Sequence, residues 1–261
     1  MALRKRNILF TATLLALFVG MAAAAINIIN DEVRTPAESL DIDGYKVSGI
    51  DVSAHNGTVD FEKAHASGVD FVFIKATEGA TFRDSLFMRN LKAANAAGIA
   101  AGAYHFFRFD VDGEKQAQNL LKAIAGQPIT LPLVIDVETE SNPYQPTDRV
   151  TRKVHDMVDV LTSYGYPVAI YSNKKGLDRH IRDEFSDCGV WICSFTQPDK
   201  NAAWTFWQYS HKGSIPGIDG DVDLDLWHGT EEQWKNYTDS TSHAISIANA
   251  LYSTINSQQS R

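Results

Sequence analysis

The sequence predicts an α/β fold, an irregular (β/α) barrel of about eight strands and about five helices, with few helices in its last third. Three observations support this prediction. Short apolar runs alternate with helical patterns, and such alternation is typical of a parallel sheet. Polar and aromatic residues recur near the carboxyl ends of those runs, where barrel proteins build their sites. The 261 residues, even without an N-terminal leader, leave enough chain for one large barrel.

The N-terminal part of the chain is expected to lie outside the barrel. Residues 1–25 have the pattern of a signal peptide, with basic residues, an apolar core over 8–19 and small residues before a cleavage point. A retained membrane anchor is the alternative, because the apolar stretch is nearly long enough to span a bilayer. We expect cleavage and export by a Sec-type route to the periplasm or the medium. Residues 26–45 would then be a polar tether.

Short apolar runs bounded by loop residues predict the strands of the barrel, which would occupy residues 46–234. They span residues 47–52, 71–76, 100–107, 133–137, 168–172, 190–194, 205–209 and 222–226.

Helical patterns separate the earlier runs. They cover residues 61–66, 86–97, 114–125, 147–164 and 174–185. Gly98, Gly126 and Gly165 stand just beyond three of these patterns, and glycine is the usual residue after a helix C-cap. Thr147 or Asp148 is a suitable N-cap for the fourth.

The last third of the chain departs from this alternation. Residues 195–204 are too few for a helical crossover, and residues 210–221 are rich in glycine and proline, as loops are. Residues 235–261 would form either a frayed tail or a short docking helix. The second alternative rests on Ile247, Ala248, Leu251 and Ile255, which have helical spacing.

Composition excludes several classes of function. The formal net charge is −8, and removal of a basic leader makes the chain more acidic, which argues against nucleic acid as a partner. Neither zinc-ligand spacing nor a phosphate-binding glycine loop is present, so we expect no metal and no cofactor. Cys188 and Cys193 are expected to be unpaired, because an extended chain between them holds their Cα atoms too far apart to bridge.

Asp136-Val137-Glu138 is the segment that points most directly to chemistry. It ends the apolar run 131–135, and residues two apart on a strand share a face. Two crowded carboxyls raise the pKa of one of them, which suits a site that needs one protonated and one ionised acid, as glycoside cleavage does. Taken by itself, the tripeptide fits a solvated strand end equally well.

Other candidate residues lie near the ends of the predicted strands. They include the acids Asp51 and Asp223. The residues expected to bind substrate are Lys75, Glu78, Tyr104, His105, Tyr171, Trp191, Trp207 and Gln208. Tyr171 and Trp207 also fit a core, since large aromatic residues are usually buried. Several carboxylates gathered at one rim are costly to stability, so their convergence favours a functional site. Flat aromatic rings beside hydrogen-bonding groups suit a polysaccharide.

Six segments, taken in order, resemble the motifs of family 25 glycoside hydrolases, which are lysozymes. The segments are residues 49–53, 73–79, 102–106, 136–138, 207–209 and 220–224. The resemblance spans about residues 46–227 and implies a flattened barrel of eight strands and five helices. It implies Glu138 as the general acid, Asp136 as its partner carboxylate, and Asp51 and Asp223 as floor acids that position substrate and tune the pair. Asp225 stands where many relatives carry asparagine.

The resemblance implies an N-acetylmuramidase that cleaves the β-1,4 bond between N-acetylmuramic acid and N-acetylglucosamine. Its partner would be the glycan strand of peptidoglycan, with no nucleic acid and no membrane anchoring after signal cleavage; whether an inhibitor or immunity protein binds stays open. Two alternatives are a silent glycan-binding or wall-tethering module and a hydrolase of another N-acetylated polysaccharide. Because Asp136 and Glu138 would share a strand face, we expect a retaining, substrate-assisted mechanism, with inversion as the second possibility.

Overall fold

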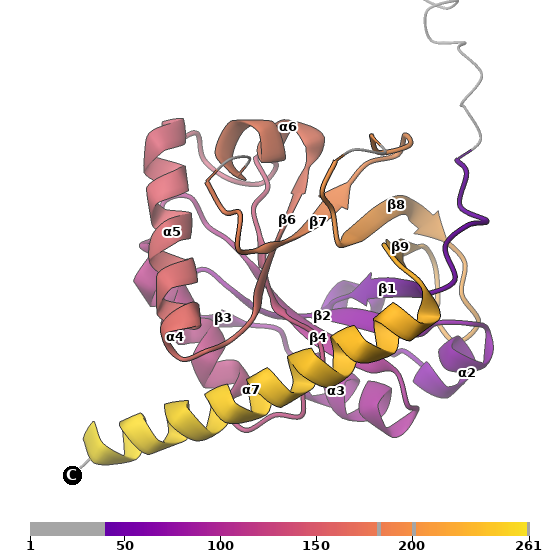
Figure 1. Ribbon diagram of the computed structural model, residues 1–261, viewed down its shortest axis with the longest axis horizontal. Helices are drawn as coiled ribbons and strands as arrows, with labels where there is room; N and C mark the ends of the chain where they lie inside the picture. Colours follow the sequence, from indigo (N-terminus) through magenta and orange to yellow (C-terminus); the bar gives the residue numbers. More distant parts are fainter. Residues whose placement is uncertain (1–39, 182–183, 200–201, 260–261) are drawn as a thin grey trace, which may run out of the picture. The chain divides into compact units, whose positions relative to one another are not determined.

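Eight strands close into a barrel in the computed structural model, which describes residues 40–181, 184–199 and 202–259 (Figure 1). The strands are β1 Ser48–Val52, β2 Phe71–Glu78, β4 Ala100–Phe106, β5 Leu133–Asp136, β6 Val168–Asn173, β7 Gly189–Cys193, β8 Phe206–Gly213 and β9 Val222–Trp227. A two-residue strand, β3 Phe82–Arg83, adds to the edge of β2. The expected barrel and its strand positions are confirmed. The expected signal peptide, and the expected tether as far as residue 39, lie outside the described residues.

The direction of β9 explains why β8 and β9 are joined without a helix. The pairs from β1 through β2, β4, β5, β6, β7 and β8 are all parallel. By contrast β9 runs antiparallel to both β8 and β1 and closes the barrel between them. An antiparallel neighbour needs only a short loop, whereas a parallel one needs a crossover. As a result, the amino end of β9 meets the carboxyl ends of the other strands.

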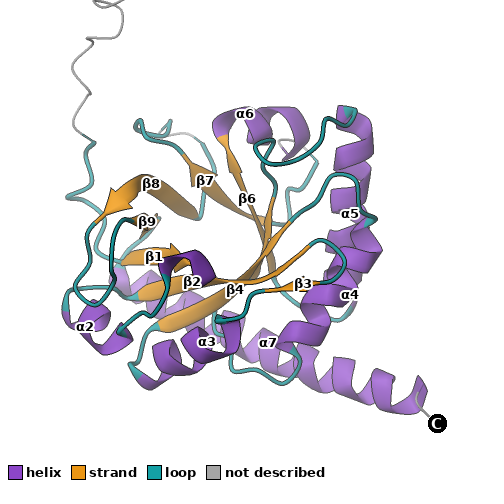
Figure 2. Cartoon of the chain, turned by 180° about the vertical axis from the view of Figure 1, so that it is seen from behind, coloured by secondary structure: helices purple, strands orange, loops and turns teal. Residues whose placement is uncertain are grey.

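The helices cover the outside of the barrel (Figure 2). Four of the five expected helices are present as α2 Phe61–Ala66, α3 Phe87–Ala96, α4 Gly113–Ile124 and α5 Thr147–Ser163. A short 3-10 helix, η1 Ala54–Asn56, follows β1. The expected helix over 174–185 is shorter. It consists of α6 Lys174–Gly176 and the π-helical turn η2 Leu177–Ile181 within the described chain. Asn173 begins it, since its side chain accepts a hydrogen bond from the Gly176 N–H at 2.9 Å.

A single long helix, α7 Glu231–Gln259, takes the place of the expected tail or short docking helix. It runs across the end of the barrel at which the parallel strands begin (Figure 1). There the Trp234 ring lies 5.3 Å from that of Phe71, and the Tyr252 ring lies 5.1 Å from that of Tyr164. The expected docking face is wrong in part. Ile247 is 57% exposed, because the buried stripe of α7 passes through Ile245, Ala248 and Tyr252 instead.

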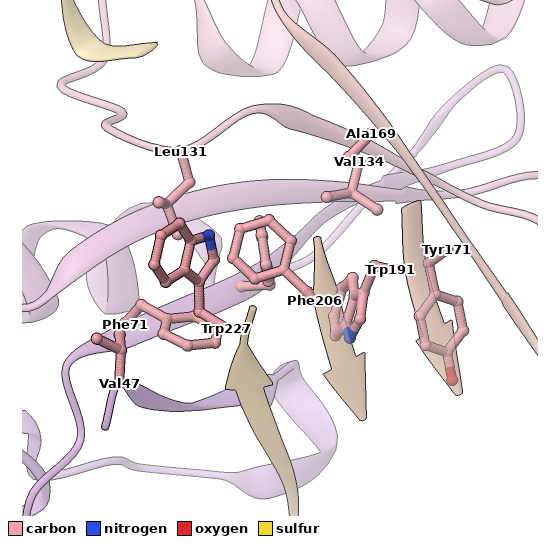
Figure 3. Close-up of a cluster of buried hydrophobic side chains, with 10 residues drawn as sticks. Val47, Phe71, Leu131, Val134, Ala169, Tyr171, Trp191, Phe206 and Trp227 are labelled. Atoms are coloured by element: carbon pink, nitrogen blue, oxygen red, sulfur yellow. The ribbon is translucent and has the colours of Figure 1, made fainter. Parts of the chain in front are cut away.

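Aromatic side chains fill the barrel interior (Figure 3). The Phe73 ring stacks on Trp191 at 4.6 Å and meets Phe206 edge-on at 5.0 Å. Tyr171 meets Trp191 edge-on at 4.6 Å and lies at one end of this group in the figure. The Tyr45 ring packs 5.9 Å from that of Trp207 on the barrel wall, so the last residue of the expected tether is part of the barrel unit.

Both cysteines are free thiols, as expected. Within the described part of the chain, no helix is both long enough and apolar enough to cross a membrane.

Candidate active site

A cleft of roughly 510 Å³ opens where the parallel strands end and β9 begins. We call it the carboxylate cleft. Its lining residues are Asp51, Tyr104, Phe106, Asp136, Glu138, Glu140, Tyr171, Asn173, Trp191, Cys193, Phe195, Gln208, His211 and Asp223. All four acids expected from the sequence are therefore brought together in one cavity.

The four acids reach the cleft from different parts of the chain. Asp51 lies on β1 and is paired in register with Asp223 at the start of β9. Asp136 ends β5, and Glu138 follows two residues later. Asp223 thus faces the cleft from the amino end of its strand, although the sequence suggested a carboxyl end. The antiparallel direction of β9 is the reason.

Asp51 is held by a relay of two hydrogen bonds. The Gln208 Nε2–H donates to Asp51 Oδ2 at 2.6 Å, and the Tyr171 hydroxyl donates to Gln208 Oε1 at 2.8 Å. Burial raises the pKa of Asp51 well above its usual value, and the nearby charge of Asp223 adds to the rise. The bond from Gln208 acts in the opposite direction, since it favours the ionised form. The relay therefore fixes the orientation of Asp51 and favours its ionised form.

Asp136 lies in surroundings that disfavour its ionised form. Burial raises its pKa well above the usual value, and the charges of Glu138 and Asp51 raise it further, while Lys75 opposes the rise. Its Oδ1 atom is enclosed and has no hydrogen-bond partner among the described residues. A buried carboxylate without partners is costly, so a positive charge or an N–H donor beside Asp136 would be strongly favoured.

Glu138 has the surroundings of a proton donor. It is only partly buried, and burial is the main cause of its raised pKa, followed by the charge of Glu140. The nearby Tyr171 hydroxyl acts against the rise. The like charge of Asp223 contributes as well. A carboxyl whose pKa is raised at a solvent-accessible position keeps a proton closer to neutral pH and can deliver it.

His105 and Trp207, both expected in the site, point away from the cleft. His105 is fully buried on the other face of β4, where it hydrogen-bonds Thr77 Oγ1 at 2.7 Å and Gln116 Oε1 at 3.0 Å. Trp207 is also fully buried, and its Nε1–H donates to the Ser194 carbonyl at 2.7 Å. Both assignments to substrate binding are wrong, because consecutive strand residues point to opposite faces. Their neighbours Tyr104 and Gln208 are the ones that line the cleft.

The other expected residues divide into lining and supporting groups. Tyr171 and Trp191 line the cleft but are 7% and 2% exposed, so they form its floor and are not open stacking platforms. Lys75 and Glu78 are not among the lining residues. The Lys75 Nζ forms an ion pair with Glu78 at 2.8 Å and lies 4.9 Å from the centre of the Phe106 ring. The pair therefore packs against Phe106, which itself lines the cleft.

Several lining residues were not expected from the sequence. Phe106, Asn173 and Cys193 each stand two positions after an expected residue, so strand alternation is the signal that identifies them. Glu140 and Phe195 lie in loops after β5 and β7. For these two, no periodic pattern exists to identify them.

The cleft combines one proton-donating acid with anions that favour a developing positive charge. No group of three or more His, Cys, Asp or Glu side chains that could hold a metal ion is found over the described ranges. Proton transfer to a leaving oxygen, with carboxylates nearby to stabilise a cationic intermediate, is the chemistry that this arrangement can perform.

Comparisons with known proteins agree with this chemistry. A family model described as glycosyl hydrolases family 25 matches residues 50–218. The chain is 33% identical over 181 residues to an autolytic lysozyme of Clostridium acetobutylicum, and the match covers 69% of this chain and 55% of that protein. It therefore spans little more than half of that relative.

Two solved structures show the same fold. A family 25 glycosyl hydrolase from Bacillus anthracis has a TM-score of 0.70 and 36% identity, over 75% of this chain and 95% of that one. A bacterial lysozyme from Streptomyces coelicolor has a TM-score of 0.68 and 28% identity, over 76% of this chain and 100% of that one.

Proposed function

The chain belongs to family 25 of the glycosyl hydrolases, and from this premise we propose that it is an exported lysozyme that cleaves the β-1,4 bond between N-acetylmuramic acid and N-acetylglucosamine in peptidoglycan. One observation carries the proposal: Asp51, Asp136, Glu138 and Asp223 line a single cleft. A module that only binds glycans has no need of a proton donor, and it would gain nothing from crowding carboxylates at a cost in stability.

Glu138 is the proposed general acid. Its raised pKa keeps the proton available, and its partial exposure lets it reach the glycosidic oxygen of a bound sugar. Asp136 is the proposed partner carboxylate. It would accept the N–H of the 2-acetamido group and stabilise the positive charge that spreads over an oxazolinium-like intermediate, which fits its crowded, partner-poor environment.

We propose that the substrate supplies its own nucleophile. Asp136 and Glu138 leave the same strand end two residues apart, so they approach a sugar from similar directions. A carboxylate on the same side as the acid is poorly placed for back-side attack, whereas the acetamido oxygen of the substrate is already on the correct face. Water would then open the oxazolinium ring, with ionised Glu138 as the base, and the β configuration would be retained.

The negative charges that raise the pKa of Glu138 are only partly the ones that the sequence suggested. The sequence suggested that Asp51 and Asp223 raise the pKa of Glu138. In the structure Glu140 contributes more than Asp223. The proposed role of Asp51 is therefore the stabilisation of positive charge on the cleft floor, where Gln208 orients it.

Digestion of purified peptidoglycan, followed by mass analysis of the products, tests the proposed function. Muramic acid at the new reducing ends is the expected result. Glucosamine at those ends, or activity only on another N-acetylated polysaccharide, would overturn the assignment. Absence of cleavage by the folded protein, with binding retained, would favour the glycan-binding module. Proton NMR of the first-formed anomer tests the mechanism: β is expected, and an initial α product would indicate inversion.

Export is a separate part of the proposal and needs its own measurement. The expected result is a mature chain that begins near residue 26, found in the periplasm or the medium by intact mass. A full-length chain that remains in the membrane fraction would contradict signal cleavage.

A further inference from the structure

Asp225 is a buried acid directly beneath the carboxylate cleft. It lies on β9 two residues after Asp223, so both side chains point to the barrel interior, but Asp225 is fully buried and does not line the cleft. Its Oδ1 atom accepts a hydrogen bond from the Trp191 Nε1–H at 2.9 Å. An acid in this position is separated from solvent by the cleft floor.

The second oxygen of Asp225 has no donor within the described chain. Oδ2 is enclosed and unpartnered when the group is written as a carboxylate. Asp51 lies on the neighbouring strand β1, two residues after Gly49, which is the register partner of Asp225, so both acids point into the barrel interior. Their interaction lowers the pKa of Asp51 and raises that of Asp225. Two carboxylates cannot hydrogen-bond to each other, since each can only accept. A hydrogen bond between Asp51 and Asp225 therefore requires a proton on one of them.

The surroundings determine which of the two acids holds that proton. Asp51 touches the cleft and accepts a bond from Gln208, both of which favour its ionised form. Asp225 has no contact with solvent, and burial is the largest cause of its raised pKa. A proton on Asp225 Oδ2 would also turn the unpartnered acceptor into a donor.

We propose that Asp225 is a positioning residue that stays protonated and donates a hydrogen bond from Oδ2 to Asp51, so that Asp51 is held as an oriented anion between Asp225 and Gln208. The inference rests on the proposed function, because the charge of Asp51 matters for a cationic intermediate. Asp225 itself makes no contact with substrate.

Among the described residues, three titratable groups interact electrostatically with Asp225. They are Asp51 on β1, Asp223 on β9 and Tyr209 on β8. The uncharged Trp191 on β7 and Gln208 on β8 also lie beside it. Ionisation of Asp225 would place a third negative charge beside Asp51 and Asp223. Deprotonation at high pH therefore removes a donor and adds repulsion at the same time.

The kinetic test compares Asp225→Asn with Asp225→Ala. An amide keeps a donor in the same place and cannot ionise, whereas alanine removes the donor. Asp225→Ala is expected to lower kcat at least about tenfold with little change in KM, which corresponds to the loss of one hydrogen bond to a charged group. Asp225→Asn is expected to keep most of the wild-type kcat. Because the amide cannot ionise, the fall in kcat that ionisation of Asp225 causes at alkaline pH should move to higher pH in this variant. If Asp225→Asn is as impaired as Asp225→Ala, a charged carboxyl is required and the proposal is wrong.

A second test does not depend on lysozyme activity. The unfolded chain releases the Asp225 proton above the usual aspartate pKa of about 3.9, whereas the folded chain keeps it. Relative to Asp225→Asn, wild type should therefore become easier to unfold as pH rises, by about tenfold in the unfolding constant per pH unit. A ratio that does not change with pH would overturn the proposal, even if the protein cleaves peptidoglycan. Conversely, failure of wild type to cleave peptidoglycan would refute the proposed function and leave this readout intact.

The third measurement needs no variant. The NMR signal of the Trp191 indole N–H reports the charge on the oxygen it binds. It should stay unchanged as pH rises through the usual aspartate range and move only at higher pH. A transition centred near the usual value of about 3.9 would show that Asp225 ionises normally.

Discussion

Gln208 and Asp51 are joined by a hydrogen bond of 2.6 Å although 157 residues separate them in the chain. Their strands, β8 and β1, are not neighbours, because β9 lies between them. Both side chains point into the closed barrel and meet across its interior. This contact connects the first acid of the sequence to the last third of the fold, and it exists only because the barrel closes.

Replacement of the general acid is the most direct test of the site. Glu138→Gln removes the transferable proton and hardly changes shape, so kcat/KM on peptidoglycan should fall by at least about 100-fold. Glu62→Gln, at an exposed position on α2, is the matched control and should retain activity. Near-full activity in well-folded Glu138→Gln would exclude this residue as the acid.

Glu140 should influence the pH dependence of the reaction. Its negative charge is the second cause of the raised pKa of Glu138, so Glu140→Gln should lower that pKa. Glu138 would then lose its proton at lower pH, and the alkaline limb of the kcat/KM profile should move to lower pH. A limb that does not move, or that moves to higher pH, would refute this coupling.

Gln208→Leu should damage catalysis without loss of the barrel. The change removes the donor to Asp51 and leaves the Tyr171 hydroxyl without its acceptor. Loss of a hydrogen bond to a buried charged group costs about 1–3 kcal/mol, which predicts a roughly 5- to 150-fold fall in kcat/KM. Gln258→Leu, at an exposed position on α7, provides the control and should leave kcat/KM unchanged. Unchanged kinetics would show that the orientation of Asp51 is unimportant.

His105 should affect stability and leave substrate binding unchanged. Burial lowers its pKa to about 4, so the folded protein keeps it neutral. The unfolded histidine binds a proton near pH 6.5, and stability should therefore fall as pH drops from about 6.5 to about 4, by about 3 kcal/mol in total. His105→Leu should lack this pH dependence and should lower the melting temperature, because Thr77 and Gln116 lose their partner.

Kinetics of the same variant distinguish the two roles of His105. The KM of the folded His105→Leu protein should stay within about twofold of wild type. His243→Ala removes an exposed histidine on α7 and is the control for the loss of a histidine side chain outside the cleft. A large rise in KM would restore His105 to the substrate site.

The sequence by itself determined which segments form strands and which acids are candidates. Apolar runs such as 131–135 carry the strand signal locally, since burial and backbone preference both act over a few residues. Asp136 and Glu138 are two residues apart, and this spacing alone predicts a common direction. The free thiols of Cys188 and Cys193 followed from chain geometry in the same way.

Tertiary structure alone decided the direction of β9, the packing of α7 and which residues of each strand face the barrel interior. Both faces of a barrel strand are buried, one against the interior and one against the helices, so apolar residues occupy both and do not indicate which face lines the cleft. For this reason His105 and Trp207 were indistinguishable in sequence from Tyr104 and Gln208. Glu140 and His211 enter the cleft through loops or bulged strand ends, whose course depends on barrel closure. Local patterns encode burial, whereas the register of a closed sheet depends on contacts between residues far apart in the chain.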